Sequence, residues 1–129
     1  MDISKIHIWV GTNFDGDYDS YFKLDYSIED IDDPSYKVCG FCKDIGLKWY
    51  DEDWIGVLRN PQIEDVDVFL SDLSVSDETL SEIKRVCINK GLEKVNAMFF
   101  YIDSNVKVRN KTKLYNKLVY IGEYDTDLD

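Results

Sequence analysis

The sequence has no long apolar run and no export signal. No uninterrupted apolar stretch approaches the roughly 20 residues that a membrane-spanning helix needs. The first 20 residues lack an apolar segment behind a basic start, which is the pattern of a secreted protein. We therefore expect a protein that stays in the cytoplasm and does not bind membranes.

Histidine occurs only once, at position 7. Any Ser-His-Asp or Cys-His mechanism would have to use His7. A nucleophile elbow, a Walker loop, a dinucleotide-binding glycine turn and a His-Glu-x-x-His helix are all absent from the sequence. No two of the 26 acidic residues stand out as a glycosidase pair. The sequence therefore predicts a protein that is not an enzyme and has no catalytic residues.

Cysteine is scarce, and its three copies are an odd number, which argues against a disulfide framework. Cys39 and Cys42 have the spacing of a dithiol redox pair. However, an acidic loop containing Pro34 precedes them, where a redox site has a strand. Carboxylates nearby, such as Asp44, are expected to raise the pKa of both thiols.

A structural zinc site would need four nitrogen or sulfur ligands. The chain offers only Cys39, Cys42, Cys87 and His7. Free cysteine usually behaves as a small buried apolar residue, so we expect structural cysteines, no metal and no cofactor. A thiol-dependent redox enzyme or a zinc protein built on Cys39 and Cys42 is the alternative.

Basic residues are few, because 15 Lys and Arg stand against 26 Asp and Glu, which gives a net charge of −11. The charge is uneven: residues 76–117 hold 9 basic and 5 acidic residues, whereas the rest of the chain is acidic. Such a field repels nucleic acid and anionic lipid and speeds encounters with basic partners roughly 10- to 1000-fold at low salt. A solvated surface that aids solubility is the simpler explanation.

The sequence is rich in apolar and aromatic residues, at 44% and 14%, and its 129 residues are a common size for one domain. Alternation predicts a half-buried strand over Lys5–Gly11, with Ile8 on one face and Trp9 on the other. The continuous apolar run 97–102 predicts a central strand covered on both faces. A further strand is expected over 118–124, followed by an acidic tail that frays.

Helices are expected between these strands. Ser76 is placed to cap a helix that ends near Gly91 and buries Ile83 and Cys87. A short helix or turn is expected to end near Gly46. Asp17 is placed to cap another short helix, and the spacing of Val66, Phe69, Leu70 and Leu73 predicts an amphipathic helix after Pro61. The segment 28–36 is expected to be an acidic surface loop. The whole chain, 1–129, is predicted to be a single α+β domain, a small and mainly antiparallel sheet with helices packed against it.

Two acidic segments stand out as candidate binding sites. The first sets three acids between large aromatics, in the order Trp49, Tyr50, Asp51, Glu52, Asp53 and Trp54. Aromatic residues anchor protein interfaces and carboxylates steer basic partners, so this segment is a candidate for the centre of an interface. The alternative places Trp49 and Trp54 in the core and leaves the acids in an exposed turn.

The second segment contains Asp15, Asp17 and Asp19, whose alternation suggests a calcium loop. Ser20 and Tyr26 stand where such a loop needs glycine and a bidentate glutamate, which argues against calcium. We expect these three aspartates to lie at the rim of the same interface and to steer a partner toward it.

Several blocks of the sequence together resemble the immunity protein 22 family. They are His7 to Gly11, Cys39 to Gly46, Trp49 to Gly56, Asn96 to Tyr101 and Tyr120 to Gly122. The resemblance implies an α+β protein of the bacterial cytoplasm that neutralises a cognate toxin of a polymorphic toxin system. It implies no catalytic residues and assigns no binding residues.

Toxins of this kind often attack nucleic acid, and a domain that binds nucleic acid is basic, which suits a partner with a charge of −11. We therefore expect a basic nuclease domain as the cognate partner, bound without catalysis, and no direct binding of nucleic acid. A general acidic mimic of nucleic acid, without one dedicated partner, is a third possibility.

Overall fold

The computed structural model describes residues 2–128. Within these residues, five antiparallel strands form one sheet in the order β2-β3-β1-β5-β4. The strands are β1 (Lys5–Gly11), β2 (Ile55–Asp65), β3 (Lys94–Ile102), β4 (Leu114–Tyr115) and β5 (Leu118–Asp125). In the same part of the chain, three α-helices and two 3₁₀ turns connect them: α1 (Gly40–Ile45), α2 (Asp67–Leu70), α3 (Asp77–Asn89), η1 (Asp19–Phe22) and η2 (Glu52–Trp54). The predicted α+β class, with a mainly antiparallel sheet in a single domain, is confirmed.

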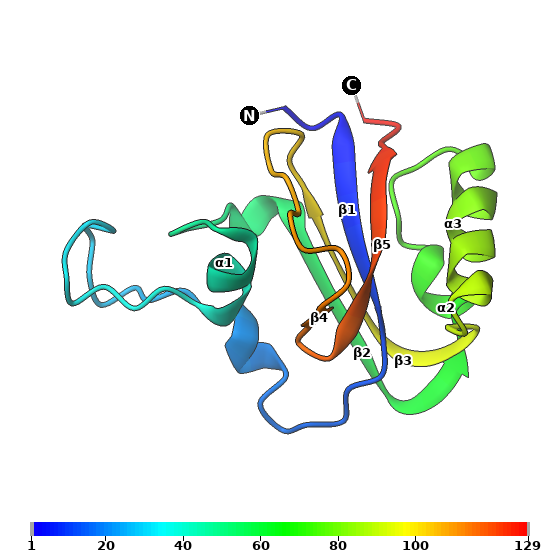
Figure 1. Ribbon diagram of the computed structural model, residues 1–129, viewed down its shortest axis with the longest axis horizontal. Helices are drawn as coiled ribbons and strands as arrows, with labels where there is room; N and C mark the ends of the chain where they lie inside the picture. Colours follow the sequence, from blue (N-terminus) through cyan, green and yellow to red (C-terminus); the bar gives the residue numbers. More distant parts are fainter. Residues whose placement is uncertain (1, 129) are drawn as a thin grey trace.

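The sheet lies between two layers, with α1 on one side and α2 and α3 on the other (Figure 1). The core on the α1 side is aromatic and contains Trp9, Phe41 and Phe99. The core on the α3 side is aliphatic and contains Ile8 and Ile83. Because successive side chains of a strand point to opposite faces, β1 and β3 each supply both cores.

The strand expected over 97–102 is confirmed as the buried part of β3, which pairs with β1 on one side and β2 on the other. The expectation that β1 is half-buried is wrong. Both its faces are covered, and Ile8 and Trp9 are fully buried. Between Ile6 and Val10, every residue of β1 except His7 is apolar or aromatic. The alternation therefore assigns residues to the two faces of the strand but does not show that both faces are covered.

Helix α3 follows the sequence closely. The Ser76 side chain accepts a hydrogen bond from the backbone N–H of Thr79 at 3.2 Å, as expected for an N-cap. Ile83 and Cys87 are fully buried. The chain leaves the helix through Gly91, whose φ of 77° lies in the left-handed region that favours glycine.

The segment after Pro61 differs from the prediction. Strand β2 extends through Pro61 to Asp65, and α2 is only four residues long. The register of β2 against β3 shifts between Arg59 and Glu64, around the proline, which has no N–H to donate to a partner strand. The four apolar residues that suggested a long helix, Val66, Phe69, Leu70 and Leu73, are nevertheless buried under α3. Their spacing corresponds to the single turn of α2 and to the residues that follow it.

Two smaller predictions are also wrong. The Asp17 side chain does not cap η1: Tyr18 precedes this turn, and Asp17 contributes only its backbone carbonyl, which accepts from Ser20 at 3.1 Å. The acidic tail is expected to fray, but it is held by hydrogen bonds up to residue 128. The Thr126 N–H donates to the Ser4 carbonyl at 3.0 Å and the Asp127 N–H donates to the Ser74 carbonyl at 2.9 Å. These two bonds tie the chain end to the start of β1 and to the loop before α3.

Candidate functional site

The turn that joins α1 to β2 carries the first candidate segment. Trp49 is 49% exposed, so the interpretation that places it in the core is wrong for this residue. Trp54 is partly buried and packs against both cores, and Glu52 and Asp53 are exposed. Tyr50 points inward and is only 3% exposed, and its hydroxyl donates to the Phe22 carbonyl. The segment therefore presents one aromatic ring and two carboxylates to solvent.

Hydrogen bonds fix the shape of this turn. The Asp51 carboxylate accepts from the Asp53 N–H at 3.0 Å, which caps η2. The Asp51 N–H in turn donates to the Tyr101 hydroxyl on β3 at 3.0 Å. Asp51 is half-buried and positions the turn, whereas Glu52 and Asp53 are the carboxylates that a partner can reach.

A hollow of about 260 Å³ lies beside Trp49, and we call it the Trp49 hollow. Its walls include Tyr26, Ile28, Glu29, Ile31, Tyr36 and Trp49. All but Trp49 come from the acidic loop 25–36, which extends away from the sheet beyond α1 (Figure 1). The sequence predicts an acidic surface loop over 28–36 and does not predict the hollow. The available signal was the set of four large apolar or aromatic residues set among its acids.

Carboxylates give the acidic loop its shape through short-range turns. Asp25, Asp30 and Asp33 each accept from the backbone N–H two residues further on, at 3.0, 2.9 and 2.8 Å. Hydrogen bonds from Ser27 and from the Lys37 N–H lower the pKa of the Asp25 carboxyl. The loop is joined to the chain before Trp49 by the Tyr36 hydroxyl, which donates to the Lys48 carbonyl at 2.9 Å.

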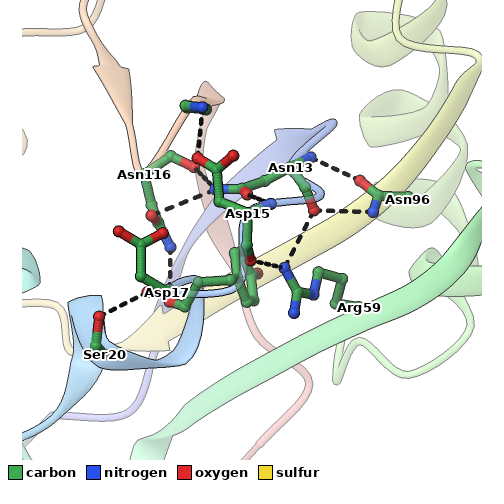
Figure 2. Close-up of polar contacts among 9 residues, drawn as sticks. Asn13, Asp15, Asp17, Ser20, Arg59, Asn96 and Asn116 are labelled. Carbon is green, nitrogen blue, oxygen red and sulfur yellow. Dashed lines mark hydrogen bonds and ion pairs between the residues drawn. The ribbon is translucent and has the colours of Figure 1, made fainter.

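The second candidate segment, 13–19, is held by a buried amide network (Figure 2). Asn13 exchanges two hydrogen bonds with Asn96 on β3, and its side chain also donates to the Asn116 carbonyl at 2.8 Å. The Arg59 guanidinium donates to the backbone carbonyl of Asp15 at 2.6 Å. These contacts fix the backbone from which the three aspartates project.

The three aspartates differ in what they offer a partner. The Asp15 carboxylate forms an ion pair with Lys117, whereas Asp17 and Asp19 are exposed. Asp19 begins η1, whose last residue, Phe22, accepts the hydrogen bond from Tyr50. The two candidate segments are thus linked through η1. Within residues 2–128, no hydrogen bond or ion pair directly joins residues 15–19 to the turn 51–53.

The Cys39–Cys42 pair lies at the start of α1. Cys39 is the N-cap, and its Sγ accepts from the Cys42 N–H at 3.3 Å. Hydrogen bonds from the Cys42 thiol and from backbone N–H groups lower the pKa of the Cys39 thiol, while the same pairing and burial raise the pKa of Cys42. The expectation that nearby acids raise both pKa values is therefore wrong for Cys39, because hydrogen bonds outweigh more distant charges. Both cysteines are buried.

The ligands that a zinc site would need do not meet. Cys87 lies in the aliphatic core under α3, whereas Cys39 and Cys42 lie in the aromatic core on the opposite face of the sheet. Within residues 2–128, no three His, Cys, Asp or Glu side chains are grouped so that they could hold a metal ion. None of the helices in this part of the chain is long and apolar enough to cross a membrane.

His7 lies in the wall of another hollow, of about 530 Å³, together with Lys107, Tyr120 and Glu123. Its Nε2 lies 3.0 Å from the Val106 carbonyl, which can only accept, so Nε2 carries the proton. Nδ1 then accepts from the Tyr120 hydroxyl at 2.8 Å. Burial lowers the pKa of His7, although Glu123 opposes this. With both nitrogens engaged and the ring neutral, His7 is placed as a structural residue and not as a general base.

Comparisons with curated proteins and with solved structures gave no match. The model of the family described as immunity protein 22 matches residues 6–127, which include both candidate segments, the Trp49 hollow and all three cysteines. On this match over almost its whole length, the chain belongs to the immunity protein 22 family.

Proposed function

We propose that this protein neutralises a cognate bacterial toxin domain, a basic nuclease, by binding it without catalysis. Membership of an immunity protein family implies toxin neutralisation. The observation that carries the proposed binding mode is the half-exposed Trp49 beside the exposed carboxylates of Glu52 and Asp53. Exposed aromatic residues anchor protein interfaces, and neighbouring charges of one sign attract a partner of opposite charge. This combination suits the centre of an interface with a basic protein.

The distribution of charge favours the acidic segments over the basic segment as the binding site for a basic partner. The exposed cations Lys107, Arg109 and Lys111 gather on the segment between β3 and β4. The acids of the loop 25–36 and of the turn 51–53 lie in segments with almost no basic residues. A basic toxin domain is attracted to the acidic segments and repelled by the basic one. Asp17 and Asp19 supply further negative charge at the rim.

Co-expression with candidate toxin domains in bacterial cells tests the proposal, and any basic nuclease domain encoded beside this gene is the first candidate. The parent protein is expected to restore growth and to bind the purified toxin domain. A Glu52→Gln, Asp53→Asn double variant is expected to bind at least about 30-fold more weakly, which corresponds to the roughly 2 kcal/mol of an interface hot spot. Asp51 is left in place because it holds the turn.

An Asp72→Asn, Glu82→Gln double variant is the matched control, because both acids are exposed on the side of the sheet that carries α2 and α3. It removes the same charge and should bind like the parent. Equal loss in both double variants would show that net charge, and not this surface, drives binding. A parent that neither restores growth nor binds would refute the immunity function for this toxin.

A further inference from the structure

The Trp49 hollow exposes apolar surface that the fold does not need. Tyr26 is 69% exposed, Trp49 49% and Ile31 39%. These three side chains come from two segments and meet around one hollow of about 260 Å³. Burying such surface stabilises a complex, against the entropic costs of association. The hollow is therefore a place where a partner's side chain gains from leaving water.

The charge around the hollow specifies the kind of side chain. The acidic loop 25–36 contains five acids and no basic residue. Asp25, Asp30 and Asp33 use carboxylate oxygens to hold turns of the loop, and Asp32 pairs with Lys48 at 2.5 Å. Glu29 lines the hollow and forms no hydrogen bond or ion pair within residues 2–128. Its carboxylate remains available to a cation that enters.

We propose that the Trp49 hollow binds an arginine side chain of the basic partner. The side chain's methylene groups and guanidinium plane lie against the rings of Trp49 and Tyr26, and the guanidinium pairs with Glu29. Arginine fits better than lysine because its guanidinium is planar, weakly hydrated and able to stack on aromatic rings while it donates to a carboxylate. The inference rests on the proposed function only for the identity of the protein that carries this arginine.

The loop is prepared for this role by its own hydrogen bonds. The turns at Asp25, Asp30 and Asp33, and the bond from Tyr36 to the Lys48 carbonyl, already hold the walls of the hollow in place. A partner therefore meets a hollow that is formed before binding, which lowers the entropic cost of association.

A titration with a small probe tests the hollow without the toxin. The probe is N-acetyl-arginine amide, and its control is N-acetyl-citrulline amide, which keeps the shape but lacks the charge. NMR is expected to show larger shifts of the Trp49 indole and the Tyr26 ring with the arginine compound, with a dissociation constant in the millimolar range. A Glu29→Gln variant should abolish the difference between the two compounds, whereas Glu82→Gln on α3 should preserve it. Equal shifts from both compounds, or none, would overturn the proposal.

The same variants then distinguish the hollow from the proposed function. With the toxin domain, Tyr26→Ala and Glu29→Gln are each expected to weaken binding at least about 10-fold, while Ile88→Ala, an exposed apolar control on α3, leaves it unchanged. If the parent binds the toxin and these two variants bind equally well, the arginine proposal is wrong and the immunity function stands. If the parent does not bind the toxin domain, the proposed function fails for that toxin. The probe titration still tests whether the Trp49 hollow binds arginine.

Discussion

Asn13 and Asn96 hold one another through two reciprocal hydrogen bonds across 83 positions of sequence. The Asn13 N–H donates to the Asn96 Oδ1 at 2.7 Å, and the Asn96 Nδ2 donates back to the Asn13 carbonyl at 2.9 Å. Both residues are buried. The pair gives the loop after β1 a fixed backbone, from which Asp15 and Asp17 project (Figure 2).

Asn96→Ala is expected to destabilise the protein by about 1–3 kcal/mol, because it leaves the buried N–H of Asn13 without a partner. The Asn13 carbonyl keeps only its 3.4 Å hydrogen bond from the Arg59 guanidinium. Urea denaturation measures this change. Asn105→Ala is the control, since the Asn105 side chain is exposed and should tolerate the change within about 0.5 kcal/mol. An Asn96→Ala variant as stable as this control would show that the amide pair contributes little.

Phe99 and Phe100 are neighbours on β3 with different surroundings. Phe99 is fully buried and stacks on Trp9, with ring centroids 4.7 Å apart and planes inclined by 16°. Phe100 faces the other side of the sheet, is half-buried and covers Gly56 on β2. Phe99→Ala should cost about 3–5 kcal/mol, and Phe100→Ala distinctly less. Thermal and urea unfolding of both variants compare them directly, and equal costs would contradict the assignment of faces.

The sequence predicts the elements that carry their own signals. Ser76 and Gly91 mark the two ends of α3, Gly46 marks the end of α1, and the apolar run at 97–102 marks a buried strand. It does not predict β2, because Pro61 suggests a break and the strand's partner, β3, begins only at Lys94, after α2 and α3. Pairing over such a separation depends on tertiary packing, which the local sequence does not report.

The same limit applies to the candidate site. The exposure of Trp49 and the burial of its neighbour Tyr50 depend on where Phe22 and Tyr101 lie, and the sequence does not place these residues near the turn. The Trp49 hollow depends on how the acidic loop folds back on itself. The sequence shows that this loop is acidic and contains large apolar and aromatic residues. Its shape depends on hydrogen bonds made by individual aspartates, which the composition does not predict.

Cys39 is expected to act as an N-cap for α1. Replacing it with alanine removes the acceptor for the Cys42 N–H and should destabilise the protein by about 1 kcal/mol. Cys39→Ser retains an acceptor of a kind favoured at this position and should stay closer to the parent. Urea denaturation of the two variants measures the difference, and a serine variant less stable than the alanine variant would contradict the capping role.

His7 should make the protein less stable in mild acid. Burial lowers the pKa of His7 in the folded protein, so the unfolded chain binds its proton more readily. The stability that the neutral ring provides is complete above the unfolded pKa of about 6.5 and is lost as the pH falls below it. A His7→Gln variant lacks this dependence.

The measurement is the free energy of unfolding of both proteins between about pH 5 and pH 8. The parent's advantage over the His7→Gln variant, measured at pH 8, should shrink as the pH falls below about 6.5. An advantage that grows in acid would mean that the pairing of a charged His7 with Glu123, 3.4 Å away, outweighs burial.

Substitutions at the rim of the proposed interface should change the association rate constant, whereas substitutions at its centre should change the dissociation rate constant. Asp17 and Asp19 are exposed and have no hydrogen bond or ion pair from their carboxylates within residues 2–128, so they act on a partner through long-range attraction. An Asp17→Asn, Asp19→Asn double variant should slow association with the toxin domain and flatten its dependence on salt, with little change in dissociation. Trp49→Ala removes an aromatic anchor and should speed dissociation about 30-fold or more, with little change in association.

Surface plasmon resonance or stopped-flow fluorescence at low and high salt separates these two effects. The control pair Asp72→Asn, Glu82→Gln should leave both rate constants within about twofold, because these acids lie on the far side of the sheet. If Trp49→Ala changed only association, Trp49 would lie outside the desolvated centre. If Asp17→Asn, Asp19→Asn changed dissociation as strongly as Trp49→Ala, these aspartates would be contact residues, and the centre of the interface would lie over η1 and the loop after β1 instead of over the turn that carries Trp49.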